Sequence, residues 1–282
     1  MKILITGAHG QLGTDITRLC RAMNWVVISY GSQDLDITRY HDVMTKIPDI
    51  RPDIIINCAA YNDVDKAKSD WEQAYQVNGL GPKNLALAAS ASGAVLVHYS
   101  TDYVFNGETN LPYTLGDKPD PISRYGASKL IGEQMVMRHA LKYFLIRTSW
   151  VFGGGNTNFV QKVLDWSNQR GQITVVDDQI SSPTYTRDLA QGRLDLIESG
   201  QYGLYHMTNS GHCSRYEWGD YILSQIGWTG ELTPGKSANF HTPATRPAFS
   251  VLDNFGTIQT IGRNLPLWQD ATNRFLREIG RI

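Results

Sequence analysis

The sequence has few cysteines and no apolar run long enough to span a membrane. Its three cysteines, Cys20, Cys58 and Cys213, are an odd number without the paired spacing of a zinc ribbon or a disulfide framework. This pattern favours the reducing cytoplasm over a disulfide-stapled secreted fold. The apolar run before Gly7 is too short for a signal peptide, so we expect neither export nor membrane insertion.

An excess of one charge is also lacking. The 26 basic and 27 acidic side chains give a net charge of −1, so no overall field attracts a nucleic acid backbone or an anionic membrane. We therefore expect neither partner. With 282 residues, 41% of them hydrophobic, the chain can bury a sizeable core as one large or two unequal domains.

Short apolar runs alternate with segments of helical periodicity in the first half of the chain. Residues 71–92 and 125–141 carry apolar side chains at helical spacing. The runs expected as buried strands are 2–6, 25–29, 53–57, 94–100 and 143–149. This alternation predicts an α/β fold: a doubly wound parallel sheet of the Rossmann type, with helices on both faces.

Three glycines follow the first expected strand. The segment "TGAHGQLG" places Gly7, Gly10 and Gly13 at GxxGxxG spacing before a segment that can form a helix. Glycines here let the backbone approach a pyrophosphate, whose charge meets the helix N-terminus. Ordinary turn glycines are the alternative, but the position between strand and helix favours dinucleotide binding.

The end of the second expected strand leaves the cofactor open between NADPH and NADH. In NAD-binding folds an acidic residue binds the ribose hydroxyls here, but this chain has Gly31 followed by Ser32. A 2′-phosphate would meet no carboxylate, which slightly favours NADPH, yet we expect no nearby arginine to hold it. Asp36 is a candidate for the adenine side of the cofactor, or an exposed turn residue.

The pattern becomes less regular after residue 150. Glycines cluster at 153–155, and Trp, Tyr and Pro concentrate between 212 and 249. We expect residues 1–150 to form the dinucleotide-binding domain and residues 151–282 mainly a smaller substrate-binding domain. Runs at 172–176 and 203–208 still resemble strands, and we expect both to rejoin the first sheet.

A tyrosine and a lysine stand four residues apart where a helix is expected to begin. The segment "YGASK" puts Tyr125 and Lys129 on one helical face. Free tyrosine has a pKa of about 10, and a nearby ammonium should lower it. Thr101 ends a central expected strand, where ligands bind in such sheets, and can hydrogen-bond a substrate carbonyl. These three side chains are candidates for proton transfer beside a nicotinamide.

These motifs resemble the extended short-chain dehydrogenases/reductases, and within them the dTDP-4-dehydrorhamnose reductase family. "TGAHGQLG" and "YGASK" are superfamily signatures, whereas "SWVFG", "SPTYTRDLA" and "RPAFSVLDN" are similar to segments of the reductases. The resemblance spans nearly the whole chain. It implies hydride transfer from a reduced nicotinamide to C4 of a 4-keto sugar nucleotide, giving dTDP-L-rhamnose, with Tyr125 as general acid.

The resemblance also implies site residues by position. The expected catalytic set is Thr101, Tyr125 and Lys129. Residues expected to bind the cofactor, together with Tyr125 and Lys129, are Gly7, Gly10, Gln11, Leu12, Gly13, Asp36, Ala59, Ala60 and Tyr61. Residues expected to bind the substrate, together with Thr101, are Tyr103, Trp150, Asn158, Phe159, Pro183, Thr184 and Arg246. The planar fork of Arg246 suits a diphosphate. We expect no metal site, although some members of the family use magnesium.

Two departures and two alternatives accompany this interpretation. His9 lies in the glycine loop, and Ser181 stands where the family usually has glycine. An epimerase or dehydratase of the same fold is one alternative; a dehydratase needs an acidic pair near the threonine, but only Asp102 is available, and we expect it to point away. A non-catalytic regulatory subunit is the other, against which the intact catalytic set argues. A homodimer is an option.

Overall fold

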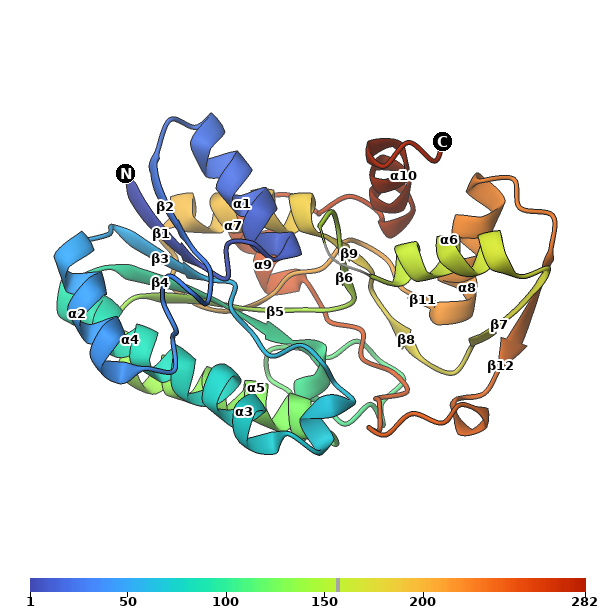
Figure 1. Cartoon of the computed structure of the whole chain (residues 1–282), viewed down its shortest axis with the longest axis horizontal. Helices are drawn as coiled ribbons and strands as arrows, with labels where there is room; N and C mark the ends of the chain where they lie inside the picture. The colour runs from blue at the N-terminus through green and yellow to red at the C-terminus, as the bar shows by residue number, and fades with distance from the viewer. Residues whose placement is uncertain (156–157) are drawn as a thin grey trace.

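A computed structural model shows a twisted parallel sheet between two layers of helices (Figure 1). The structure describes residues 1–155 and 158–282. Across the six-stranded sheet the order is β10 (Gly203–His206), β5 (Tyr143–Thr148), β4 (Val95–Thr101), β3 (Ile54–Asn57), β1 (Lys2–Thr6) and β2 (Val26–Tyr30). The predicted doubly wound sheet is confirmed, and the five strands expected in the first half all belong to it.

Because side chains alternate in direction along each strand, the sheet contributes to two separate apolar cores. Successive side chains of a strand point to opposite faces, so Ile3 and Ile5 of β1 lie in one buried cluster and Leu4 in the other. Helices α1 (Gln11–Ala22), α7 (Thr186–Ser199) and α9 (Phe255–Ile261) cover one face, and α2 (Tyr40–Ile50), α4 (Gly81–Ser92) and α5 (Arg124–His139) cover the other (Figure 1). The described residues include no helix that could cross a bilayer.

The helix expected over residues 71–92 is interrupted. It consists of α3 (Trp71–Tyr75), a π-helical turn η2 (Gln76–Leu80) and α4. Such turns are frequent at functional sites. Further short 3₁₀ turns are η1 (Lys66–Lys68), η3 (Asp102–Val104) and η4 (Ser237–Asn239).

A second, smaller apolar core lies beyond the end of the sheet. It gathers Phe152, Trp218 and Phe275. Its helices are α6 (Phe159–Gln169), α8 (Arg215–Gln225) and α10 (Trp268–Glu278), and its strands are β6 (Val151–Phe152), β7 (Gln172–Val176), β8 (Ile180–Ser181), β9 (Thr184–Tyr185), β11 (Cys213–Ser214) and β12 (Glu231–Gly235). These strands pair as β6–β9, β7–β12 and β8–β11.

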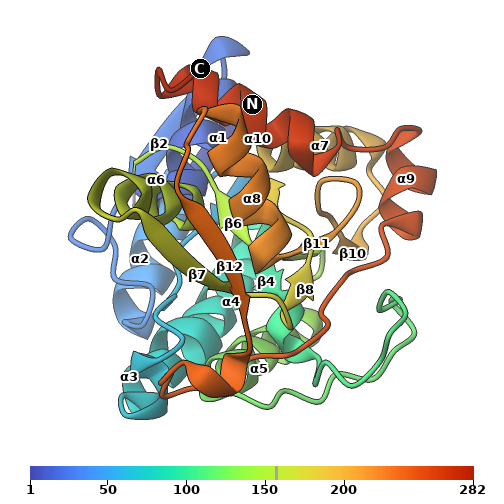
Figure 2. The ribbon, with the colours of Figure 1, turned by 90° about the vertical axis from the view of Figure 1, so that its right-hand side faces the viewer.

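The prediction that residues 172–176 rejoin the main sheet was wrong. β7 pairs in parallel with β12, far along the chain, and Figure 2 shows the two strands side by side. The reason is visible in its burial: alternate residues of β7 are exposed, whereas β1 and β3 are buried on both faces. A strand with one solvent-exposed face can pair in a small two-stranded sheet whose other face packs against helices. Residues 203–206, by contrast, form the edge strand β10 beside β5.

A buried ion pair ties β5 to α5. Arg147 and Glu133 are 3% and 0% exposed, and the guanidinium donates from Nε to Oε1 at 2.9 Å and from Nη2 to Oε2 at 2.7 Å. His206 of β10 lies 3.4 Å from Arg147 Nη1, and burial lowers its pKa to about 3. The neutral imidazole therefore adds no second positive charge to the pair.

Removing one partner of this pair should cost far more stability than removing a surface pair. Glu133→Gln leaves a buried guanidinium without its counter-charge, so we expect a loss of roughly 3–5 kcal/mol. Arg263→Met, which breaks the solvent-exposed pair of Arg263 with Asp195, should cost about 0–1 kcal/mol. Urea unfolding with linear extrapolation measures both, and equal losses would contradict the structural role of the buried pair.

Candidate active site

The glycine loop lets three backbone segments meet at the carboxyl edge of the sheet. Gly7 has φ of +64°, and a Cβ there would lie 2.5 Å from the Ala59 backbone nitrogen. A Cβ on Gly13 would lie 2.4 Å from the Gly7 oxygen. Only glycine fits both positions, and Gly10 then forms the N-cap of α1 without a side chain in the way. The result is an open helix N-terminus of the kind that binds a pyrophosphate.

A cavity of about 760 Å³ adjoins this loop beside the end of β2. Of the residues expected at the cofactor, it is lined by Gly7, Gly10, Asp36, Ala59, Ala60 and Tyr61. Arg39 and Lys46 line it too, together with Gly31 and Ser32. The expectation of no nearby arginine was therefore wrong, because Arg39, at the N-cap of α2, lines the same cavity as Gly31.

This cavity offers charges of both signs. Asp36 Oδ1 accepts hydrogen bonds from Thr38 N at 2.9 Å and from Thr38 Oγ1 at 2.8 Å, and Asp36 Oδ2 lies 3.7 Å from Arg39 Nε. A cation for a 2′-phosphate and a carboxylate for ribose hydroxyls thus stand side by side. NADPH and NADH both stay open as cofactors.

An asparagine of the π-helical turn fixes the backbone of Tyr61. Asn78, 1% exposed, accepts from Tyr61 N at 2.8 Å and donates to Tyr61 O at 2.9 Å. Its amide also donates to Ser128 Oγ at 3.0 Å, next to Lys129 on α5. Asn78 therefore joins the segment after β3 to the helix that carries the catalytic candidates. Sequence reasoning missed it, because only the interruption of the helix directs its side chain here.

The three catalytic candidates line one cavity of about 400 Å³. Thr101 comes from the end of β4, and Tyr125 and Lys129 from the first turns of α5. The same cavity is lined by the cofactor candidates Gly10, Gln11, Leu12, Gly13, Ala59 and Ala60. The structure thus brings the expected catalytic set and the glycine loop to one place.

Helix α5 begins beside Thr101 for two local reasons. Ser123 caps the helix, its Oγ accepting from Gly126 N at 3.1 Å. Gly126 then lies against the turn after β4: a Cβ there would be 2.1 Å from the Tyr103 oxygen. Any larger residue would force the helix away from the strand end, so the glycine sets the distance between Tyr125 and Thr101.

The expected lowering of the Tyr125 pKa does not occur. Burial raises the pKa of Tyr125, the nearby charge of Asp102 adds to the rise, and hydrogen bonding with Thr101 opposes it only in part. The Lys129 amine is instead directed to Tyr99 O, to which it donates at 2.6 Å, and burial lowers its pKa to about 8. Tyr125 is therefore protonated at neutral pH and can serve as a proton donor.

Asp102 does not point away along the strand, as we had expected. It is 2% exposed, and its Oδ1 accepts from Thr101 Oγ1 at 3.0 Å. Its Oδ2 accepts from Ser250 Oγ at 2.5 Å and from Ser181 Oγ at 3.3 Å, which gives the unusual Ser181 a role. Burial raises the Asp102 pKa to about 6, so the carboxylate form still predominates at pH 7.

These contacts fix the direction of the Thr101 hydrogen. A hydroxyl has one hydrogen to donate and two lone pairs. Thr101 gives its hydrogen to Asp102 and accepts from Tyr103 N at 3.1 Å. The hydroxyl keeps one acceptor position, and donating to a substrate carbonyl, as the sequence predicts, would require its hydrogen to turn away from Asp102.

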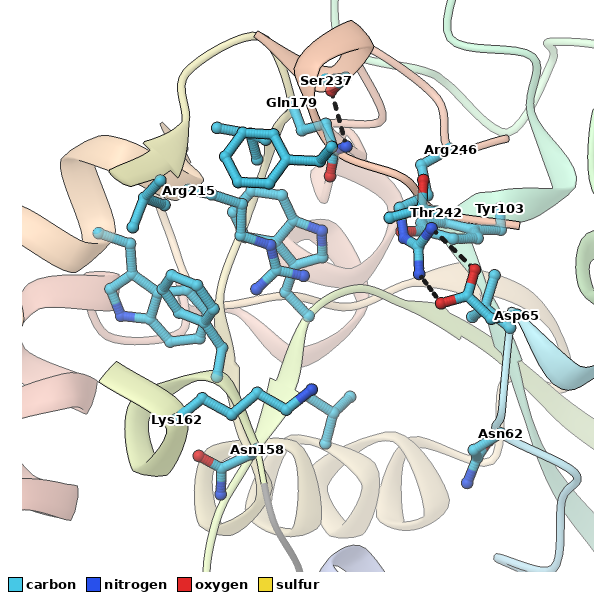
Figure 3. Close-up of a pocket in the computed structure, with 18 of the residues that line it drawn as sticks. Asn62, Asp65, Tyr103, Asn158, Lys162, Gln179, Arg215, Ser237, Thr242 and Arg246 are labelled. Atoms are coloured by element: carbon cyan, nitrogen blue, oxygen red, sulfur yellow. Dashed lines mark hydrogen bonds and ion pairs between the residues drawn. The ribbon is translucent and has the colours of Figure 1, made fainter. Parts of the chain in front are cut away.

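A larger cavity of about 680 Å³ adjoins the catalytic one (Figure 3). The expected residues on its wall are Tyr103, Trp150, Asn158, Phe159 and Arg246. Asn62, Trp150, Val151 and Asn158 line both cavities. A ligand can therefore extend from Tyr125 past Trp150 into the larger space. Among the described residues, Pro183 and Thr184 are buried behind this wall, where Thr184 N donates to Trp150 O at 3.2 Å.

Sequence reasoning missed two cations of the larger cavity, Lys162 on α6 and Arg215 on α8. The Arg215 guanidinium carbon lies 3.6 Å from the ring centroid of Trp150. Burial lowers the pKa of Arg215 to about 10, which leaves it charged at neutral pH. Nothing in the segment "CSRYEW" marks this arginine, since only the folding of α8 against Trp150 places it in the cavity.

No group of three or more histidine, cysteine, aspartate or glutamate side chains within residues 1–155 and 158–282 is arranged to hold a metal ion. The carboxylates of Asp15 and Glu278, which lie close together, are paired with Arg18 and Arg187.

Comparison with known proteins decides the family. Residues 1–281 match the family model described as the RmlD substrate binding domain. The dTDP-4-dehydrorhamnose reductase of Burkholderia thailandensis is 34% identical over 99% of this chain and 99% of its own length. The chain belongs to the dTDP-4-dehydrorhamnose reductase family. The family predicted from the sequence motifs is confirmed.

One further relative and one solved structure are similar to nearly the whole chain. The spore coat polysaccharide biosynthesis protein SpsK of Bacillus subtilis is 37% identical over 98% of this chain and 97% of its own length. The crystal structure of a dTDP-4-dehydrorhamnose reductase from Bacillus anthracis in complex with NADP superposes with a TM-score of 0.95, at 38% identity, covering 98% of this chain and 99% of that one.

Within this reductase, the glycine loop yields a direct test. In Gly13→Ala the added Cβ clashes with the Gly7 oxygen and pushes α1 away from the loop, so NADPH and NADH should each bind at least about tenfold more weakly, a loss of about 1.4 kcal/mol. Gly171→Ala is the matched control, since a Cβ there meets nothing within 4 Å. Fluorescence titration of both cofactors measures the effect. Unchanged affinity in Gly13→Ala would place the cofactor elsewhere.

Proposed function

We propose that this chain reduces the 4-keto group of dTDP-4-dehydro-L-rhamnose, giving dTDP-L-rhamnose, with NADPH or NADH as reductant. One observation carries the proposal: Thr101, Tyr125 and Lys129 share a cavity with the glycine loop, and that cavity opens past Trp150 into a second, larger one. The first has the position for a nicotinamide and a sugar, and the second has room for a nucleotide. The names of the relatives support the choice of substrate.

The loop residues fit a nicotinamide dinucleotide. The cradle formed by Gly7 and Gly13 is space that a Cβ would fill, and the cavities on either side of it run from Asp36 to Lys129. Gly10, Gln11, Leu12 and Gly13 would hold the pyrophosphate, and Ala59, Ala60 and Tyr61 would line the path of the cofactor. A reduced nicotinamide supplies the hydride when bound.

The chain's own residues supply the proton. Tyr125 holds it, because burial keeps the phenol protonated, and donates it to the oxygen at C4 as the carbonyl becomes an alkoxide. Thr101, which donates to Asp102, can accept from a sugar hydroxyl next to C4 and so orient the sugar. Lys129, directed to Tyr99 O, lies where it can hold the nicotinamide ribose.

The carboxylate side chains that line the catalytic cavity favour reduction over dehydration. A dehydratase needs an acidic pair near the threonine, and Asp102 is the sole carboxylate among the described residues that line the catalytic cavity. Its bonds to three hydroxyls make it an orienting group. A regulatory subunit is disfavoured, since it has no need to keep Thr101, Tyr125 and Lys129 in one cavity.

The wider expectations stay predictions from the sequence. These are a homodimer as an option, a cytoplasmic location, the lack of a nucleic acid partner, and a boundary near residue 150 between a cofactor-binding and a substrate-binding domain. The proposed reaction depends on none of them.

Replacing the proton donor tests the proposal. Tyr125→Phe should lower kcat by roughly 10²–10⁴, the usual contribution of a positioned acid, while cofactor affinity is kept because the ring remains. Tyr202→Phe, at a partly exposed ring on the far edge of the sheet, is the matched control. Turnover of dTDP-4-dehydro-L-rhamnose is followed by nicotinamide absorbance. Near-normal turnover by Tyr125→Phe would remove the tyrosine from the mechanism.

A further inference from the structure

Two cations of the larger cavity have no direct ion pair among the described residues, although Asp63 and Asp65 line the same space. In the part of the chain that the structure describes, neither the Arg215 guanidinium nor the Lys162 amine forms an ion pair or a side-chain hydrogen bond with another residue. Figure 3 shows both on one side of the cavity, with Arg246 and Asp65 on the other. An unpaired guanidinium held among apolar rings is costly to keep, so its position calls for an anionic ligand.

Three aromatic rings surround the Arg215 guanidinium. The ring centroids of Trp150, Phe159 and Trp218 lie 3.6, 4.8 and 5.6 Å from its carbon. Stacking of this kind is attractive and fixes the plane of the group. All five N–H donors of arginine lie in that plane and point away from its faces. None of the Arg215 side-chain donors has a hydrogen-bond partner in the part of the chain that the structure describes, so they are available to a ligand with two acceptor oxygens, such as a phosphate.

The arginine first expected to bind the diphosphate is already occupied. Arg246 donates to both oxygens of Asp65, at 3.1 and 2.8 Å, and to Ala244 O at 3.0 Å. These bonds use much of its donor capacity and neutralise its charge. Arg215, with no such partner, is the better anion ligand of the two.

The place of Arg215 fits the geometry of a sugar nucleotide. Its stacking partner Trp150 lines both the catalytic and the larger cavity. In a pyranose ring C1 lies opposite C4, so a sugar with C4 at Tyr125 directs C1 and its attached diphosphate away from Tyr125, toward the larger cavity. Trp150 and Arg215 stand at that passage, and Lys162 lines the same space.

We propose that Arg215 and Lys162 bind the diphosphate of the sugar nucleotide, Arg215 through two parallel hydrogen bonds and Lys162 as a point charge. The choice of a nucleoside diphosphate rests on the proposed function. The two cations then make the enzyme selective for a diphosphate-linked sugar over a free sugar or a neutral glycoside. Lys162, which is exposed to solvent, contributes less than Arg215.

Calorimetric titration of the full chain with dTDP, thymidine and inorganic pyrophosphate tests the proposal. Arg215→Met keeps the apolar contact with Trp150 and removes the donors, so dTDP should bind roughly 10- to 100-fold more weakly and thymidine unchanged. Arg215→Lys should fall between, because it keeps the charge without the planar fork. Lys162→Met should show a smaller loss. Arg170→Met, exposed at the end of the same helix as Lys162, controls for a general change of charge.

Two results would overturn the proposal. One is an Arg215→Met enzyme that binds dTDP and pyrophosphate as tightly as the parent chain. The other is an equal loss for thymidine and dTDP, which would make Arg215 a packing residue; thermal melting of each variant identifies loss of folding. Failure of the proposed function looks different: dTDP-4-dehydro-L-rhamnose would not be turned over, while pyrophosphate binding would still depend on Arg215.

Discussion

The close approach of helix α5 to the backbone after β4 is the constraint on which the site depends. With no side chain at Gly126, the first turn of the helix rests directly on the Tyr103 carbonyl. That contact holds Tyr125 beside Thr101 and directs Lys129 to Tyr99 O. One turn further along, Glu133 is locked to Arg147 of β5. A helix fixed at both points cannot slide along the sheet, so Tyr125, the proposed proton donor, keeps its place relative to the glycine loop.

A second constraint joins the two halves of the site at Trp150. This residue has φ of +42°, a left-handed conformation that is unusual for a bulky side chain and costs about 1–3 kcal/mol. This conformation turns the chain from β5 into β6 and places the indole between the two cavities. Its ring packs parallel to that of Trp218 at 6.0 Å and carries the Arg215 guanidinium. The smaller apolar core thereby stabilises a residue that lines both cavities of the proposed site.

Local signals in the sequence were enough for much of this. Apolar periodicity predicted the central strands and α5, and the spacing of the glycines and of Tyr125 and Lys129 pointed to residues that the structure brings to one cavity. The features that the sequence did not predict depend on contacts between segments far apart in the chain. β7 pairs with β12 some 59 residues later, as Gln172 with Glu231, and Asp102 turns inward because Ser181 and Ser250 meet it there. Arg39 and Arg215 belong to the site only through a turn and a helix packing that no short motif encodes.

In the proposed reaction, C4 of the sugar meets the nicotinamide beside Tyr125, at the junction of the two cavities. The most direct measurement is transfer of deuterium from NADPH labelled at nicotinamide C4 to dTDP-4-dehydro-L-rhamnose, with the product analysed by NMR. The account predicts that the label, taken from one face of the nicotinamide, appears at C4 of the rhamnose and nowhere else in the sugar. A product without deuterium at C4, or with it at another carbon, would contradict the account.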